Sequence, residues 1–134
     1  MVKELLVNET LSEAMIKSGA QLVEQMDKDM ADVKSAFWFY ISEEHLWKLI
    51  FVSDKVAEEG PRKYYKRIID ANKSLSKGSL QISISDIGVS TADNPIVQLL
   101  SMMINTGNSI NGIRFSKNTI NGHFIDDVYI YRMQ

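Results

Sequence analysis

The two histidines of the chain, His45 and His123, are the residues best suited to metal binding or acid–base chemistry. His45 follows Glu43 and Glu44, and His123 is followed by acids at 126 and 127. Imidazole together with carboxylates could bind zinc or manganese. However, alternation along a strand would put Asp126 on the face opposite His123, and no HExxH or other spaced ligand set occurs. We therefore expect no metal and no cofactor, with both histidines beside loops or turns.

Other catalytic patterns are weak or missing. The chain has no cysteine, which excludes thiol catalysis, disulfides and thiolate zinc sites. It contains no Gly-x-Ser-x-Gly elbow, no Walker A run and no Gly-x-Gly-x-x-Gly loop. Ser53-Asp54-Lys55 lacks the spaced acids of a metal-dependent nuclease. The sequence therefore favours a protein that is not an enzyme, and a metal-dependent hydrolase or nuclease ranks third among the functions considered.

Basic residues gather in the region 61–75, where the pattern predicts a helix. On a helical wheel, Arg62, Lys63, Lys66 and Arg67 fall opposite the apolar half. Such a stripe could bind a phosphorylated ligand or a nucleic-acid backbone. Charges opposite an apolar stripe are also the ordinary solvent-facing side of a surface helix, and the net charge of the chain is −2. Nucleic acid is therefore the alternative partner rather than the favoured one.

Two runs, Ala36-Phe-Trp-Phe-Tyr-Ile41 and Trp47-Lys-Leu-Ile-Phe-Val52, are rich in aromatic and β-branched residues. Their spacing predicts a hairpin with a short loop. The apolar content is nearly continuous, which is typical of strands that are covered on both faces. Burial in the core is the ordinary role of such aromatics. If one face is incompletely covered, Trp38 and Tyr40 would form a surface for a ligand or partner.

Asn121-Gly122 gives the clearest local signal, because it lies between two β-rich runs over 113–120 and 123–130. This pair predicts a hairpin with a type I′ turn, in which both turn residues have positive φ. A two-residue turn fixes the register. It places Lys117 opposite Asp126, where the two could form a cross-strand ion pair.

The remaining elements are three helices and one strand. A capping-box pattern, Thr10-x-x-Glu13, starts a helix over 11–29, and Pro residues start helices over 61–75 and 95–105. Strict alternation over 80–85 predicts a half-buried strand. The order is α-β-β-α-β-α-β-β, which indicates one α+β domain over 11–134 with a five-stranded, mostly antiparallel sheet, after a lead-in over 1–10.

The helix predicted over 95–105 is apolar almost all round. We expect it to contact a second copy through an interface of Leu99, Leu100, Met102 and Met103, as a dimer, or to meet another protein partner. The competing interpretation places this helix in the centre of the fold. No apolar run approaches the roughly 20 residues that span a bilayer, and the first residues lack the pattern of a signal peptide. We therefore expect a cytoplasmic protein without membrane contact.

Several motifs resemble a family of short, uncharacterised bacterial proteins. The matching motifs are Ala36-Phe-Trp-Phe-Tyr, Trp47-Lys-Leu, Gly60-Pro61-x-x-x-Tyr65, Gly112-Ile-Arg-Phe-Ser, Asn121-Gly122 and Tyr129-Ile-Tyr-Arg132. The resemblance covers the chain from about residue 11 onward. It implies a self-contained bacterial domain and brings no catalytic residue, because no activity is assigned to that family. Together with the motifs above, it predicts a small cytosolic protein that acts by association rather than catalysis.

Overall fold

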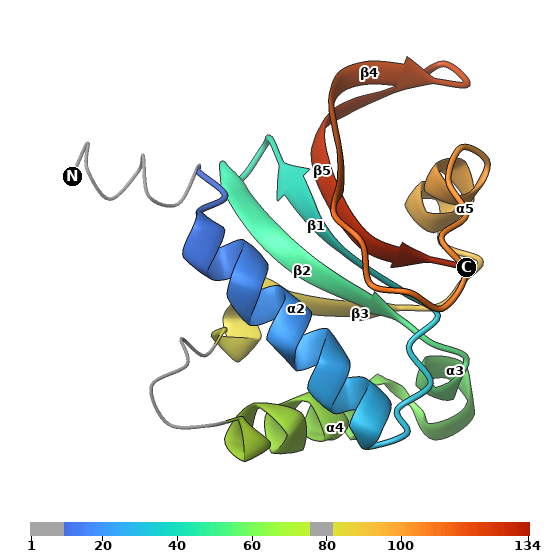
Figure 1. Ribbon diagram of the computed structural model, residues 1–134. Helices are drawn as coiled ribbons and strands as arrows, with labels where there is room; N and C mark the ends of the chain where they lie inside the picture. Colours follow the sequence, from blue (N-terminus) through green and yellow to red (C-terminus); the bar gives the residue numbers. More distant parts are fainter. Residues whose placement is uncertain (1–9, 76–81) are drawn as a thin grey trace.

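The computed structural model of the chain describes residues 10–75 and 82–134 (Figure 1). Within these residues, a five-stranded mixed sheet combines with four α-helices. The strand order is β3-β2-β1-β5-β4, in which β3 runs parallel to β2 and the other neighbours are antiparallel. The α+β class and the order of elements predicted from the sequence are confirmed.

The elements have the following bounds in chain order. They are α2 (Glu13–Lys28), β1 (Ser35–Ile41), β2 (Leu46–Val52), α3 (Lys55–Glu59), α4 (Pro61–Ser74), the 3-10 helix η1 (Ile84–Asp86), β3 (Ile87–Ser90), α5 (Pro95–Ser101), β4 (Ile113–Ile120) and β5 (His123–Met133). None of the helices in the described ranges is both long enough and apolar enough to cross a membrane.

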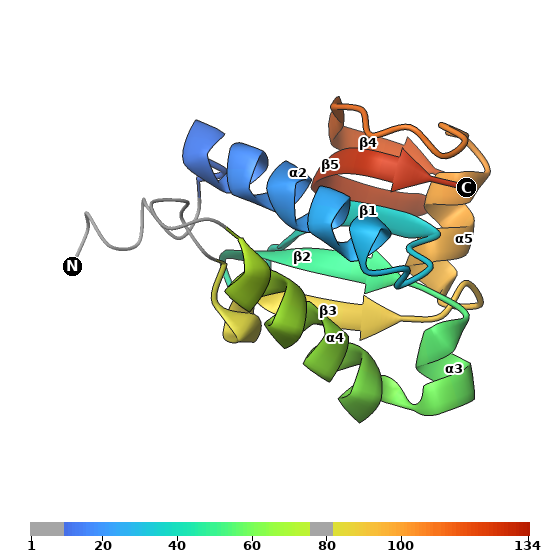
Figure 2. The ribbon, with the colours of Figure 1, turned by 60° about the horizontal axis from the view of Figure 1, so that its bottom comes forward.

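Helices cover both faces of the sheet, as the continuous apolar content of β1 and β2 predicts. The helices α2 and α4 lie on one face, and α5 lies on the other (Figure 2). Side chains of β1 alternate accordingly: Ala36 and Trp38 belong to the apolar cluster with α2, and Phe37 belongs to the cluster with α5. The paired strands β4 and β5 curl around α5, so this short helix lies in a concave part of the sheet (Figure 1).

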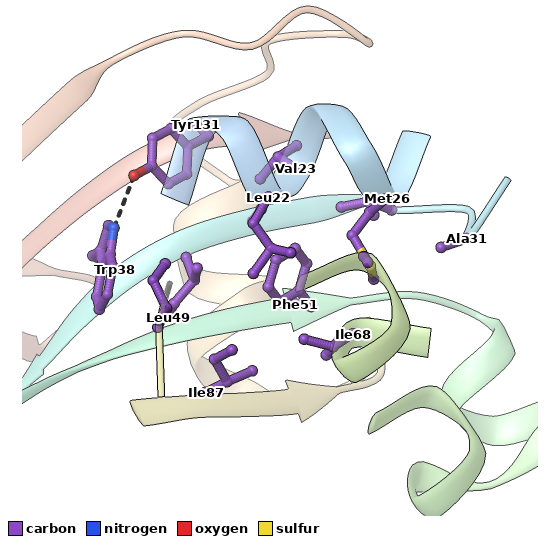
Figure 3. Close-up of a cluster of buried hydrophobic side chains, with 14 of the residues drawn as sticks. Leu22, Val23, Met26, Ala31, Trp38, Leu49, Phe51, Ile68, Ile87 and Tyr131 are labelled. Atoms are coloured by element: carbon purple, nitrogen blue, oxygen red, sulfur yellow. Dashed lines mark hydrogen bonds between the residues drawn. The ribbon is translucent and has the colours of Figure 1, made fainter. Parts of the chain in front are cut away.

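The core beneath α2 contains a hydrogen-bonded pair of aromatic side chains, Trp38 and Tyr131 (Figure 3). Trp38 Nε1 donates to the hydroxyl oxygen of Tyr131 at 2.8 Å, and that hydroxyl donates to the carbonyl oxygen of Ile16 at 2.6 Å. Gly19 permits this close approach of helix and sheet, because a Cβ atom there would lie 2.2 Å from the Tyr131 hydroxyl oxygen. The small residue therefore fixes how closely α2 packs on β5.

The hairpin of β4 and β5 has the predicted turn and register. Asn121 and Gly122 have φ values of 50° and 82°, so both turn residues take the positive φ that a type I′ turn needs. Ile120 pairs with His123 next to the turn, and Ile113 pairs with Ile130 at the far end. The two-residue turn therefore sets the pairing along the whole hairpin.

The side chains of this hairpin that point toward the core switch from one face to the other at the middle of the hairpin. Ile125 and Val128 pack in the same apolar cluster, although strict alternation would put residues three apart on opposite faces. Lys117 has a positive φ of 51°, and the pairing passes over Lys117 and Asp126 while keeping its register on both sides. The local twist brings the apolar residues of both halves of the hairpin toward α5.

The predicted ion pair between Lys117 and Asp126 is wrong. The twist removes these two residues from the pairing, and the cross-strand ion pair seen among the described residues of this hairpin joins Arg114 and Asp127 instead. Arg114 Nε and Nη2 donate to the two carboxylate oxygens of Asp127 at 3.0 and 2.7 Å. The guanidinium carbon of Arg114 also lies 5.5 Å from the centre of the Trp47 ring.

The strand predicted over 80–85 is wrong where it can be tested. Residues 80 and 81 lie outside the described residues, and residues 82–85 are not a strand, since β3 starts only at Ile87. Ser83 starts the η1 turn, its side chain accepting a hydrogen bond from Ser85 N. Side chains that bond to nearby backbone compete with a strand ladder, which explains why alternation alone misled here.

Two helix boundaries also differ from the prediction. Ser12, not Thr10, caps α2, because its Oγ accepts a hydrogen bond from Met15 N at 3.1 Å. The helix α5 ends at Ser101 rather than 105, since Met102 and Met103 form a turn after it. The apolar sequence beyond residue 101 therefore continues as exposed turn and not as helix.

Candidate functional site

The two histidines do not form a metal site. His45 lies in the loop between β1 and β2, with Nδ1 3.5 Å from the hydroxyl oxygen of Tyr40, and His123 begins β5. Both imidazoles are exposed. Across residues 10–75 and 82–134, no group of three or more His, Asp or Glu side chains is placed to hold a metal ion.

The basic stripe of α4 contains three exposed cations and one that is paired. Arg62, Lys63 and Lys66 are exposed. Arg67 donates two hydrogen bonds to the carboxylate of Glu59, at 2.9 and 2.7 Å. These bonds raise the pKa of Arg67 and lower that of Glu59, so the pair stays charged. One of the four predicted ligand-binding residues is thus already bound to an acid of the same chain.

The aromatic candidates lie in different environments. Trp38 is 1% exposed in the core under α2, so it has the core role that was favoured for these aromatics, and the alternative of a surface for a ligand or partner is wrong for this residue. The apolar sequence around it is continuous because both faces of β1 are covered. Tyr40 is half-buried against Trp47, with ring centroids 5.4 Å apart. Tyr40 also lines a hollow at the end of β1, so part of its side chain stays accessible.

The four interface candidates divide into two pairs. Leu99 and Leu100 are buried in the apolar cluster between α5 and the sheet. Met102 and Met103 follow the helix and are 68% and 54% exposed. The first pair therefore attaches α5 to its own fold, whereas the second pair faces solvent.

Three hollows with apolar lining residues lie near α5 and the β4–β5 hairpin, two of them beside α5 and one between the end of β1 and β5. Met102 and His123 line a hollow of about 220 Å³ between α5 and the turn of the β4–β5 hairpin. Ile96 belongs to this hollow and to one of about 160 Å³ that reaches Phe39. Phe39 in turn belongs to one of about 170 Å³ that reaches Phe124, a side chain 63% exposed. We name the area of Ile96, Met102, Met103, Phe39 and Phe124 the α5–hairpin surface.

A larger hollow of about 420 Å³ contains a buried arginine, and we name it the Arg132 hollow. Its polar lining consists of Asp27 in α2, Asp32 in the connection to β1, Asn108 in the connection from α5 to β4, and Arg132 and Gln134 at the end of β5. Met30 and Val33 complete the lining.

Arg132 is 5% exposed and is held from two sides. Its Nη1 and Nη2 donate to the two carboxylate oxygens of Asp27 at 2.8 and 2.7 Å, and Nη1 also donates to the carbonyl oxygen of Val33 at 3.1 Å. Its buried Nε has no acceptor among the described residues. This pair could not be predicted from sequence patterns, because 105 positions separate its members.

Comparisons with protein-family models, with curated proteins and with solved structures found no match to this chain. A function must therefore be inferred from the chain's own residues.

Proposed function

We propose that this protein acts by association through the α5–hairpin surface, first of all with a second copy of itself. The observation that carries the proposal is the exposure of three large apolar side chains, namely Met102 and Met103 directly after α5 and Phe124 near the turn of the hairpin. Met102 and Phe124 line two different hollows, and a third hollow shares Ile96 with the first and Phe39 with the second. Contiguous exposed apolar areas are typical of interaction sites, whereas scattered apolar residues are ordinary.

The size of the hollows favours a protein surface over a small ligand. Each measures about 160 to 220 Å³. Sites for small molecules usually measure about 300 to 1,000 Å³. Hollows of the smaller size can each receive a side chain of a partner, and the flexible thioethers of Met102 and Met103 can adjust to its shape.

A two-fold dimer is the simplest form of this association. It would bury the same surface on both copies, and it is the commonest closed arrangement of identical chains. Leu99 and Leu100 would then support α5 from within, while Met102 and Met103 form the contact. A cytoplasmic setting agrees with the absence of cysteine.

Light scattering on the purified chain tests this proposal. We expect the mass of a dimer at micromolar concentration. The double variant Met102→Glu/Met103→Glu should be a folded monomer, because both side chains are exposed and the charges oppose only the contact. Met30→Glu is the matched control, since Met30 is 79% exposed but lies outside the α5–hairpin surface, and this variant should remain dimeric.

A wild-type mass of one chain at about 100 μM would exclude the proposed homodimer, because a contact that forms at micromolar concentration would be largely formed there. A dimer that persists in Met102→Glu/Met103→Glu would place the contact elsewhere. For a different protein partner, the same pair of variants is diagnostic. A specific partner should bind the wild type and Met30→Glu and should be lost from the double variant.

A further inference from the structure

The Arg132 hollow shares no lining residue with the α5–hairpin surface, and its walls are fixed to the sheet. The connection from α5 to β4 is attached to β5 by Thr106, whose N–H donates to the carbonyl oxygen of Met133 at 2.8 Å. Gln134 N donates to the carbonyl oxygen of Lys34 at 3.2 Å, which holds the end of β5 beside the start of β1. The polar side chains of the hollow therefore project from anchored backbone.

The arginine of this hollow is already occupied by an acid. A buried guanidinium is the usual receptor for the carboxylate or phosphate of a ligand, because its N–H groups match two oxygens at once. Here both oxygens of Asp27 fill that position, and the carbonyl of Val33 takes a further N–H. An anionic ligand would have to displace Asp27. The hollow is thus poorly suited to anions.

The remaining polar groups of the lining include both donors and acceptors, and the one that carries an unpaired charge among the described residues is Asp32. Asp32 has an exposed carboxylate and forms no ion pair within residues 10–75 and 82–134. Gln134 Nε2 donates to Asn108 Oδ1, which leaves the side-chain oxygen of Gln134 as a further acceptor. Since Asp27 and Arg132 neutralise each other, Asp32 gives the lining one uncompensated negative charge. The nearby Lys34 is bound to Asp54 at 3.5 Å and so has its own counter-charge.

We propose that the Arg132 hollow binds a small organic cation, an amine or a guanidine. Its positive charge would lie against Asp32, and its N–H groups would reach the acceptors of Gln134 and the outer lone pairs of Asp27. The volume of about 420 Å³ is within the usual range for a small-molecule site. Arg132 then acts as a positioning residue, because it holds the Asp27 carboxylate at the wall of the hollow without contacting the cation.

NMR titration of the ¹⁵N-labelled chain tests the proposal. The probes are ethylguanidinium and spermidine, with propionate and propionamide as the anionic and neutral controls. We expect saturable shifts at the backbone amides of Asp32, Val33 and Asn108 with both cations, and none with the controls. A ligand of about six non-hydrogen atoms should bind in the millimolar range.

A pair of substitutions separates this site from general attraction of cations to an acidic surface. Asp32→Asn keeps the size of the side chain and removes its charge, so cation affinity should fall by about tenfold. Asp29→Asn removes a charge three positions away from Asp32, at the C-terminal cap of α2. Because Asp29 lies outside the hollow, this variant should bind the cation with unchanged affinity. Equal losses in both variants, unchanged affinity in Asp32→Asn, or shifts that never saturate would each overturn the proposal.

Discussion

Tyr64 and Tyr131 each place a hydroxyl group inside the fold, against a backbone carbonyl oxygen. The hydroxyl of Tyr64 donates to the carbonyl of Ala31 at 3.0 Å, and that of Tyr131 donates to the carbonyl of Ile16. Both side chains are almost fully buried. Burial raises the pKa of Tyr64 from 10.0 to about 12 and also raises the pKa of Tyr131, because the phenolate would be poorly solvated.

These raised pKa values predict that the fold loses stability in alkali. The unfolded chain releases the tyrosine protons near pH 10, before the folded chain does, so stability is full below pH 10 and falls as the pH rises toward 12. Tyr64 alone should account for about 2 to 3 kcal/mol of this fall. Urea unfolding over a series of pH values measures it. The variant Tyr64→Phe should have a lower free energy of unfolding than the wild type at neutral pH, but this free energy should fall less steeply between pH 10 and 12. An equally steep fall in the two proteins would contradict the prediction.

At the scale of elements, local sequence determines the hairpin of β4 and β5, and the turn can be tested directly. Gly122 has a φ of 82°, and a Cβ atom there would meet nothing within 4 Å. Any loss of stability on substitution is therefore backbone strain and not a clash. Gly122→Val should lower the free energy of unfolding by about 1 to 3 kcal/mol, because a β-branched residue is strongly disfavoured at positive φ.

Gly122→Asn is the matched control for the turn, since asparagine tolerates this conformation. It should cost clearly less than valine. Equal losses in the two variants, measured as shifts of the thermal midpoint, would show that the side chain at this position matters in another way.

Other elements show where local sequence is insufficient. The turn residues Asn121 and Gly122 determine their own conformation, so the register followed from sequence alone. The switch of the buried side chains from one face of the hairpin to the other at Lys117 could not be predicted from sequence, because it depends on how the hairpin wraps around α5. The strand β3 was placed too early because alternation over 82–85 does not reveal the turn that Ser83 starts; the carbonyl of Ile82 accepts a hydrogen bond from Asn72 Nδ2.

At the scale of the whole molecule, the sequence predicted part of the α5–hairpin surface and nothing of the Arg132 hollow. Met102 and Met103 were recognised from the apolar pattern of the helix predicted over 95–105, whereas Phe124, in the β-rich run over 123–130, was not among the predicted contact residues. The Arg132 hollow was missed entirely. A single arginine in a β-rich run and a single aspartate in an amphipathic helix are ordinary surface residues by pattern, and only the packing of α2 on β5 brings them together.

The pair of Arg132 and Asp27 joins α2, the start of β1 and the end of β5, so its removal should affect the fold as a whole. Its two members are unequally exposed: the side chain of Arg132 is 6% accessible and that of Asp27 is 39%. Asp27→Ala leaves a buried guanidinium without its counter-charge and should lower the free energy of unfolding by about 2 to 4 kcal/mol. Arg132→Met leaves a carboxylate that water can reach and should cost less, about 1 to 2 kcal/mol.

The double variant Asp27→Ala/Arg132→Met tests whether Asp27→Ala costs more than Arg132→Met because it leaves a buried guanidinium without its counter-charge. Once the guanidinium is absent, removing Asp27 leaves no buried charge, so the double variant should be nearly as stable as Arg132→Met alone. The coupling between the two substitutions, obtained from urea unfolding of all four proteins, should therefore be close to the loss in Asp27→Ala, about 2 to 4 kcal/mol. Additive losses would mean that the two residues stabilise the fold through separate contacts. A larger loss for Arg132→Met than for Asp27→Ala would mean that the packed stem of Arg132, rather than its charge, holds α2 against β5.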